Sequence, residues 1–160
     1  MSTKNRAIWY IVFCFLVSTL ASTHATGQTP TMLGARAGLY ADREDAFIGG
    51  EFLTPIVGFL YFNPNIEYVF VENGTRATFN LDFHYDFPLG GRVFTWAGLG
   101  LGILYNNPDG PAGSRTDPAA NVLFGLGFNA GSWVPYVQAK AIASDNSDFV
   151  FGGGVRFSLE

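Results

Sequence analysis

One short segment of the chain, residues 77–87, alternates strictly between apolar and polar side chains. A helix would scatter the aromatic rings around its circumference, whereas a strand places every second side chain on the same face. The segment therefore predicts a β-strand with one apolar and one polar face. The apolar face carries Ala77, Phe79, Leu81, Phe83, Tyr85 and Phe87, and the polar face carries Thr78, Asn80, Asp82, His84 and Asp86.

The same period of two recurs along the rest of the chain. No helical period intervenes, and the segments are near the ~9–11 residues that a tilted membrane-spanning strand needs. With residues 77–87 the predicted strands number eight. This even number favours an all-β fold, in the form of an eight-stranded antiparallel up-and-down β-barrel. The further segments are 33–40, 48–52, 63–70, 93–105, 121–128, 133–142 and 149–159.

The distribution of charge decides which face of these strands meets which solvent. Charged residues make up only 14% of the chain, and a soluble barrel would need a well-charged outer face. An Arg or Lys facing lipid at mid-bilayer costs about 2–4 kcal/mol. We therefore predict a transmembrane barrel, with a secreted soluble barrel that binds a small apolar ligand as the alternative. The charges within the strands all fall on the face with the glycines: Arg36, Glu51, Glu67, Asp82, Asp86, Lys140 and Arg156.

Residues 1–25 have the features of a secretory signal peptide. Lys4 and Arg6 precede an apolar run over 7–21, and cleavage is predicted after Ala25 or, alternatively, after Ala21. The run is shorter than the ~20 residues of a spanning helix, which argues against a membrane anchor. The predicted mature domain is the barrel, 26–160. The net charge of −4 excludes a basic nucleic-acid binder.

The predicted connections alternate in charge. The odd ones, 42–45, 72–76, 106–117 and 144–148, carry charged residues, whereas the even ones, 54–58, 88–91 and 129–132, do not. Outer-membrane barrels have longer loops outside and short turns in the periplasm. The longest predicted outer loop, 106–117, could contact a surface partner, although a solvated loop with no task fits equally well. Aromatic residues near the periplasmic ends predict a girdle: Phe59, Tyr61, Phe87, Phe94, Trp96, Phe128, Trp133 and Phe157.

The segment 33–159 resembles the small eight-stranded outer-membrane barrels of the OmpA/OmpX type. Its end, Gly154, Phe157 and Leu159, is similar to the C-terminal signal that the bacterial barrel-assembly machinery recognises, although the usual final aromatic residue is absent. The resemblance implies a bacterial outer-membrane location. It also implies membrane lipid and the assembly machinery as partners, and we expect a monomer.

Hairpin geometry predicts how the inward polar residues meet. A first hairpin centred between Arg43 and Glu44 places Arg36 opposite Glu51. A second, centred on Asn73 and Gly74, pairs Glu67 with Asn80, Asn65 with Asp82 and Asn63 with His84. Three bases would then meet three central acids (Glu51, Glu67 and Asp82) in a closed, salt-bridged interior without an open pore. The predicted interior cluster is Arg36, Glu51, Asn63, Asn65, Glu67, Asn80, Asp82, His84, Gln138, Lys140 and Arg156.

The inward glycines leave a second possibility open, a cavity for a small apolar or lipidic ligand. A cavity would remain unless Phe47, Phe94, Trp96 and Tyr136 fill the vacated space, and Tyr136 opposite Gly125 would be such a large-against-small contact. The inward glycines are Gly49, Gly98, Gly100, Gly102, Gly125, Gly127, Gly152 and Gly154.

A lipid-modifying enzyme is the third possibility, because some small outer-membrane barrels act on lipids. Catalysis would need a base and a nucleophile within hydrogen-bond reach. His84 is the only histidine after the signal peptide, and its same-face neighbours Asp82 and Asp86 supply no serine. With no second histidine and no cysteine beside it, the trio is also a weak metal site. We therefore predict a structural or surface-interaction protein with no catalytic residue, no metal and no cofactor.

Overall fold

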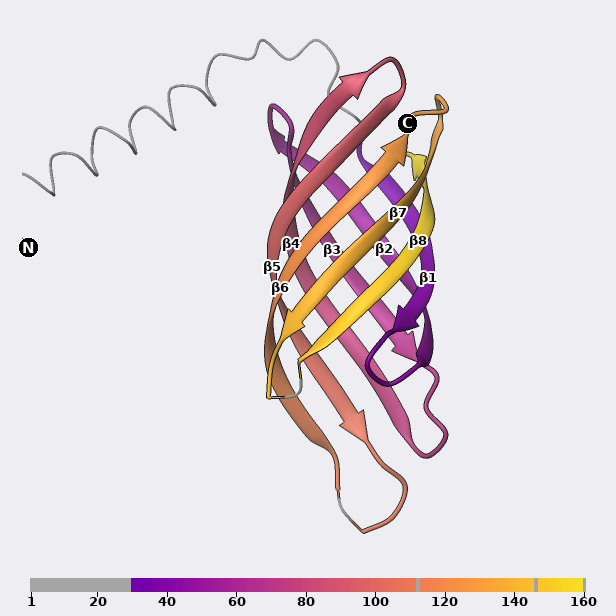
Figure 1. Ribbon diagram of the computed structural model, residues 1–160, viewed down its shortest axis with the longest axis vertical. Coiled ribbons are helices and arrows are strands. Elements are labelled where there is room, and N and C mark those ends of the chain that lie inside the picture. The colour runs from indigo at the N-terminus through magenta and orange to yellow at the C-terminus, as the bar shows by residue number, and fades with distance from the viewer. Residues whose placement is uncertain (1–29, 112, 146, 160) are drawn as a thin grey trace, which may run out of the picture.

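In the computed structural model, which describes residues 30–111, 113–145 and 147–159, eight antiparallel strands close into one barrel, β1 pairing with β8 (Figure 1). The predicted fold class is therefore confirmed. The predicted signal peptide, 1–25, lies outside the described residues. The strands are β1 (Met32–Tyr40), β2 (Asp45–Val57), β3 (Leu60–Val69), β4 (Thr75–Gly90), β5 (Val93–Asn107), β6 (Arg115–Phe128), β7 (Trp133–Ala143) and β8 (Asp148–Ser158). Within the described residues no helix is long and apolar enough to cross a membrane.

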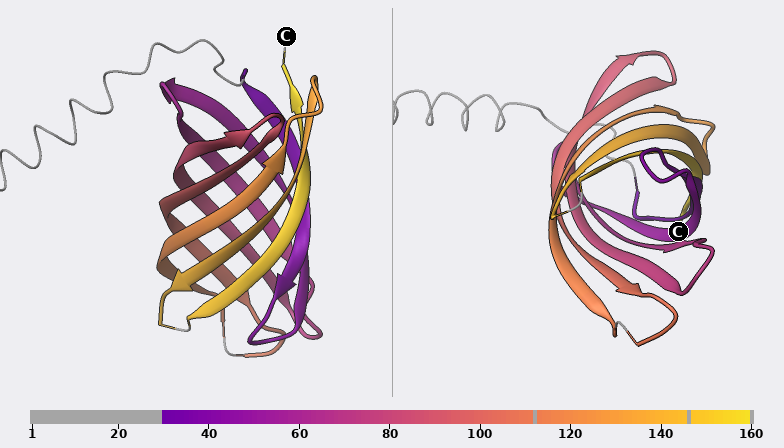
Figure 2. Two further views of the ribbon diagram at one scale, coloured as in Figure 1. Left: turned by 45° about the horizontal axis from the view of Figure 1, so that its top comes forward. Right: turned by 60° about the horizontal axis from the view of Figure 1, so that its bottom comes forward.

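The connections lie at two opposite ends of the barrel. The connections β1–β2, β3–β4, β5–β6 and β7–β8 lie at the end drawn at the bottom of Figure 1, which we call the hairpin end. The other three lie at the opposite end, the terminus end, together with the C-terminus (Figures 1 and 2). The β5–β6 connection extends furthest at the hairpin end. It is shorter than the predicted loop 106–117, because the strands continue to Asn107 and restart at Arg115.

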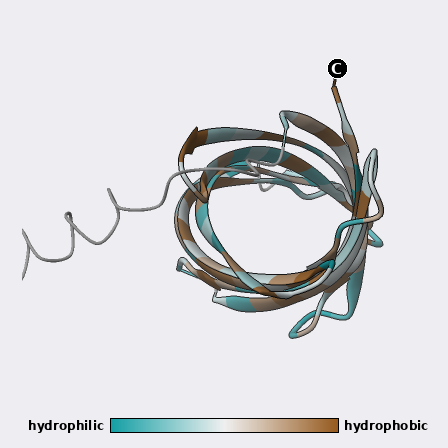
Figure 3. Cartoon of the chain, turned by 90° about the horizontal axis from the view of Figure 1, so that it is seen from above, coloured by the Kyte–Doolittle hydropathy of each residue, from teal (hydrophilic) through white to brown (hydrophobic). Residues whose placement is uncertain are grey.

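Alternation along the strands sorts the side chains into an inner and an outer set. Figure 3 shows the closed ring along its axis, with hydropathy changing from residue to residue along each strand. Large apolar side chains point outward and are exposed, as at Leu99 (65%) and Leu101 (69%). Their neighbours point inward, where fifteen polar or charged residues are buried among those the structure describes. The barrel is thus apolar outside and polar inside.

The register of the first hairpin is displaced by two residues from the predicted one. Arg36 faces Gly49 rather than Glu51, because the strands close on a four-residue connection, 41–44. Glu44, the last residue of that connection, has a φ of 58°, the left-handed region typical of tight turns. A displacement by two keeps each side chain on its predicted face. Arg36 therefore still approaches Glu51, although diagonally.

The second hairpin is displaced in the same way. Glu67 faces Thr78 rather than Asn80, because the connection between β3 and β4 extends over 70–74. Gly74, with a φ of 109°, lies near the end of this connection and not at its centre. The other two predicted pairs change accordingly: Asn65 faces Asn80 rather than Asp82, and Asn63 faces Asp82 rather than His84.

A proline interrupts the ladder between β2 and β3. Pro64 has no N–H to donate, and the pairing there is broken between Glu51 and Thr54 of β2. The side-chain amide of Asn63 donates to the backbone carbonyl oxygen of Phe52 at 3.0 Å. An interior side chain therefore supplies a hydrogen bond to the wall where the backbone cannot.

Candidate functional site

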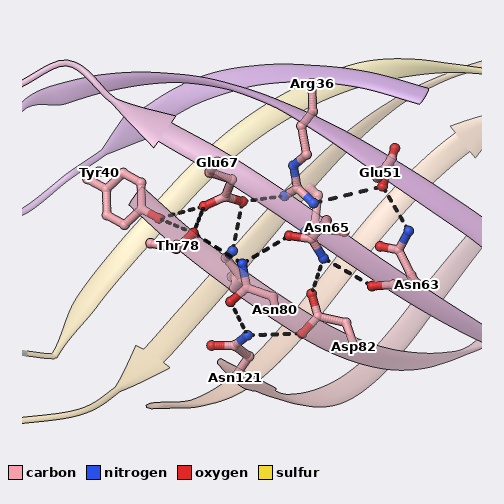
Figure 4. Close-up of polar contacts among 12 residues, drawn as sticks. Arg36, Tyr40, Glu51, Asn63, Asn65, Glu67, Thr78, Asn80, Asp82 and Asn121 are labelled. Atoms are coloured by element: carbon pink, nitrogen blue, oxygen red, sulfur yellow. Dashed lines mark hydrogen bonds and ion pairs between the residues drawn. The ribbon is translucent and has the colours of Figure 1, made fainter. Parts of the chain in front are cut away.

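The structure places all eleven residues of the predicted polar cluster inside the barrel, each at most 6% exposed. They come from six strands, β1 to β4, β7 and β8, and converge on the barrel axis. Burial of so many polar groups is tolerated only where each finds partners. The candidate site is therefore the network that these side chains form in the middle of the barrel, part of which Figure 4 shows.

Glu51 is the first centre of this network. Its carboxylate accepts hydrogen bonds from Arg156 Nε at 2.9 Å and Arg156 Nη2 at 3.1 Å. The Tyr136 hydroxyl donates to it at 2.5 Å, and the Asn63 amide at 3.1 Å. Arg36 Nη1 lies 3.8 Å away. Charge-assisted bonds of this kind are the strong ones, so Glu51 links β1, β2, β3, β7 and β8.

Glu67 is the second centre. Lys140 Nζ lies 2.8 Å and Arg36 Nη2 3.2 Å from its carboxylate oxygen. The hydroxyls of Tyr40 and Thr78 donate to the other oxygen at 2.5 and 3.0 Å. Because Arg36 lies between the two centres, it joins Glu67 to Glu51 (Figure 4).

The third predicted acid, Asp82, has a different environment from the one expected. No base among the described residues forms an ion pair with it; its oxygens accept from the side-chain amides of Asn65 and Asn121, each at 2.9 Å. Asn80 donates to Asn65 at 3.0 Å and accepts from Asn121 at 2.9 Å. The prediction that three bases meet three acids is therefore wrong for Asp82, which belongs to a chain of amides (Figure 4).

Four members of the network were missing from the predicted cluster: Tyr40, Thr78, Asn121 and Tyr136. The alternation had already assigned each of them to the inner face. Their hydroxyl and amide groups are the usual partners of buried carboxylates. Gln138, which was predicted, accepts from the indole N–H of Trp96 at 3.3 Å, at the edge of the network.

The inward glycines make room for large neighbours. A Cβ added at Gly125 would lie 2.1 Å from the Trp96 ring, and one at Gly127 would lie 2.6 Å from Phe94. The Tyr136 ring lies over Gly154, and not over Gly125 as predicted, while Phe47 lies over Gly38 and Gly152. On β5, a Cβ at Gly100 would lie 1.9 Å from the carboxylate of Asp82. All four side chains named as possible fillers thus occupy space that glycines vacate.

Apolar layers flank the polar network on both sides. At the terminus end, Phe94 packs against two clusters of buried apolar residues. The layer at the hairpin end consists of Tyr40, Phe47, Val69, Ala119, Ile142 and Val150. The layer toward the terminus end consists of Met32, Leu53, Tyr61 and Val134, with Trp96, Leu123 and Tyr136 beside it. The network therefore lies between two apolar layers.

The predicted aromatic girdle is only partly present. Tyr61 and Trp96 are fully buried inside the barrel, and Phe94 packs against the interior clusters. Each of these three residues occupies a strand position whose side chain points into the barrel. This alternation, and not closeness to the end of the strand, decides where the ring lies. The outward members are at least 43% exposed: Phe87, Phe128, Trp133 and Phe157.

His84 lies among aromatic rings rather than beside a nucleophile. Its ring centroid is 5.7 Å from Tyr61 and 5.5 Å from Trp96. His84 Nε2 is 3.7 Å from Asp86 Oδ1, and neither ring nitrogen forms a hydrogen bond. Among the described residues no three His, Cys, Asp or Glu side chains form a group that could hold a metal ion. His84 therefore packs between two aromatic rings and has one polar contact, with Asp86.

Ion pairs join neighbouring hairpins at the hairpin end. Each pair connects elements that are not consecutive in the chain, so the pairs tie the rim of the barrel together. They are Arg43 with Asp148 at 3.6 Å, Arg76 with Asp45 at 2.8 Å, and Arg115 with Asp145 at 2.6 Å. All the arginines of this rim that the structure describes take part in a pair.

No family model and no curated protein sequence matches the chain. Solved structures do. The N-terminal β-barrel domain of Pseudomonas aeruginosa OprF superposes with a TM-score of 0.72 at 16% identity, over 82% of this chain and 98% of that one. Neisserial surface protein A gives 0.58 at 12% identity, over 81% and 94%. The outer membrane enzyme PagL gives 0.54 at 14%, over 80% and 99%. The chain therefore has the fold of the small eight-stranded outer-membrane β-barrels.

Proposed function

We propose that the protein is an integral β-barrel of a bacterial outer membrane, with a closed polar interior and a structural or surface-interaction role. The proposal rests on one observation: the charged residues in the middle of the strands are buried inside the barrel, whereas the outer wall is apolar. Arg36, Glu51 and Glu67 are at most 5% exposed, whereas Leu99 and Leu101 are more than 60% exposed. Soluble monomers rarely expose apolar surface on this scale. A bilayer is the solvent that such a surface fits.

The likeness to outer-membrane barrels supports the same location. In that membrane the hairpin end, which carries the charged connections, would face outward, and the terminus end would face the periplasm. The β5–β6 connection, which extends furthest, is the part best placed to reach a surface partner (Figure 1).

The interior supports a closed barrel rather than a pore. Eight strands enclose only enough space for side chains or one small ligand. Here the rings of Trp96, Phe94 and Phe47 lie over the inward glycines, and the apolar layers flank the network. Water and ions would have to cross both layers, so we expect no steady conductance.

We propose no catalytic role. The fold alone does not decide this, because PagL is an outer membrane enzyme with a similar fold. The local chemistry argues against catalysis. His84 is buried between Tyr61 and Trp96, and its nearest ionisable partner, Asp86, is an acid on the same strand. A nucleophile within reach of the imidazole would be required.

Assembly of such a barrel needs export and insertion. We propose that residues 1–25 direct export and are removed, and that Gly154, Phe157 and Leu159 form the signal that the barrel-assembly machinery reads. Phe157 and Leu159 are 56% and 46% exposed on the outer wall, where a receptor could reach them before insertion. We expect the inserted barrel to be a monomer surrounded by lipid.

Cell fractionation tests the location. The full chain is expressed, the outer membrane is isolated, and the protein is run on a gel with and without boiling. We expect it in the outer membrane with a mobility that shifts on heating, because a closed barrel resists detergent until it is heated. A soluble periplasmic protein with no shift would contradict the proposal. Planar-bilayer recording of the purified barrel then tests the interior, and a steady open conductance would contradict the closed state.

A further inference from the structure

Two apolar grooves cross the outer wall. The first, of about 330 Å³, is lined by two residues with little or no outward side chain, Gly50 and Pro64, and by the bulkier Leu33, Phe52, Ile66 and Phe79. In the strand register Leu33 faces Phe52, while Gly50 faces Ile66, which in turn faces Phe79. The groove therefore runs diagonally between two rows of bulky side chains.

The second groove, of about 360 Å³, lies over β6, β7 and β8. Ala139 stands in register between Phe124 and Phe151, so a small side chain separates two large ones. Leu126 and Val137 continue the lining. In a ring of eight strands, β6–β8 lie across the barrel from the β2–β3 pair, so each side of the barrel has one groove.

No close contact within the described part of the chain requires glycine at position 50. A Cβ added there would meet only the carbonyl oxygen of Gly34, at 3.9 Å, which is an ordinary contact. Gly153, on the same outer face, differs, because its added Cβ would lie 2.8 Å from the carbonyl oxygen of Tyr136. The absence of a side chain at Gly50 therefore keeps the groove open without serving the packing of the barrel.

We propose that the grooves hold acyl chains of membrane lipids as bound rather than passing neighbours, an inference that rests on the proposed membrane location. Each groove lies within the outward apolar wall, and its exposed lining residues are apolar. The polar residues that also border the grooves, Glu51, Asn65 and Gln138, are buried. A groove one side chain across is about one strand spacing wide, ~4.8 Å, which suits a single methylene chain. Its volume would take roughly ten groups of about 30 Å³ each.

A second copy of the chain fits these grooves less well. Stable protein interfaces bury about 1,200–2,000 Å² with close shape complementarity. Here the bulky side chains, such as Phe52 and Phe151, stand beside narrow depressions rather than forming one flat patch. A flexible hydrocarbon chain adapts to such a surface, whereas a second rigid barrel would leave the depressions empty.

Filling the grooves tests the proposal. Gly50→Leu fills the first groove, and its Cβ makes only an ordinary contact, with the carbonyl oxygen of Gly34 at 3.9 Å. Ala139→Leu fills the second groove. Ala120→Leu is the matched control, since Ala120 is exposed on the outer wall and lines neither groove. Each protein is inserted into bilayers of phosphatidylethanolamine and phosphatidylglycerol, extracted in mild detergent, and analysed by native mass spectrometry for retained phospholipid.

We expect the unmodified barrel and Ala120→Leu to retain phospholipid, each filled groove to lose its share, and the double variant to lose nearly all of it. Equal retention in all variants, or none in the unmodified barrel, would overturn the proposal. A dimer that Gly50→Leu converts to a monomer would assign the groove to a second copy and would overturn it as well. Heat-shifted electrophoresis of the same samples separates the two proposals: a chain that never inserts contradicts the membrane location, whereas an inserted barrel with unchanged retention contradicts only the lipid grooves.

Discussion

The inner and outer faces of the same strands obey different rules. On the inner face a Cβ at Gly125 would lie 2.1 Å from the Trp96 ring, whereas on the outer face a Cβ at Gly50 meets nothing closer than 3.9 Å. Inside, each residue is constrained by the shape and charge of a particular neighbour. Outside, at positions such as Gly50, the main constraint is the solvent, which an apolar side chain satisfies. Four predictions test this contrast.

The largest effect is expected where an inner charge loses its partner. Glu51→Ala leaves Arg156 buried without its carboxylate and removes one of two acids near Arg36. Stranding a buried charge costs about 3–5 kcal/mol. We expect the free energy of unfolding, measured by urea titration in lipid vesicles with tryptophan fluorescence as the probe, to fall by about that amount.

The control for this substitution removes both charges. Glu51→Leu combined with Arg156→Met leaves no stranded ion, and apolar replacement of a buried pair is often neutral. The double variant is therefore expected to recover much of the lost stability. If Glu51→Ala alone cost less than ~1 kcal/mol, Arg156 would be reached by water and the interior would not be closed.

The outer wall should reject a charge. Leu101 is 69% exposed in the middle of β5, and Leu101→Arg is expected to cost about 2–4 kcal/mol in the same titration, because the guanidinium would face hydrocarbon. Tyr105→Arg, close to the hairpin end of the same strand, should cost only about 0–1 kcal/mol. Equal costs at the two positions would mean that the wall does not face a bilayer.

Glycine should be required inside and dispensable outside. Gly125→Ala forces the Trp96 ring to move and is expected to destabilise the barrel by about 1–3 kcal/mol. Gly50→Ala should be neutral or stabilising by up to ~1 kcal/mol, since alanine restricts the unfolded chain and meets no obstacle. Thermal unfolding of both variants in one detergent compares them directly. A larger loss at Gly50 than at Gly125 would invalidate the contrast.

The smallest effect is expected at the rim. Arg115 is exposed and pairs with Asp145 at 2.6 Å, and exposed pairs contribute little because water screens them and the side chains lose freedom. Arg115→Ala should leave the unfolding midpoint unchanged within error. A marked loss would show that the β5–β6 hairpin depends on this contact for its position.

Alternation was enough to predict the barrel, the strand number and the burial of Arg36, Glu51 and the other polar residues, because a period of two is a local property. It could not predict which of them meet. The registers depend on the length of each connection. Glu44 and Gly74 lie in connections whose length cannot be read from the alternation of apolar and polar residues. The environment of Asp82 was mispredicted for the same reason, since its amide partner Asn121 lies on β6, far along the chain. Tyr61 and Trp96 were assigned to the girdle because they lie near the ends of their strands, although the alternation of inward and outward positions already placed them inside the barrel.

The contact between Glu51 and Arg156 joins residues 105 positions apart, and the Arg43–Asp148 pair likewise joins the first hairpin to the last strand. Neither can form until β1 has met β8. Closing so long a loop is slow, because the entropy of the chain is lost before the contact is gained. An open sheet thus lacks these two contacts and the β1–β8 ladder. We expect folding to have a late, cooperative final step, and half-inserted barrels to be short-lived intermediates that either close or come apart.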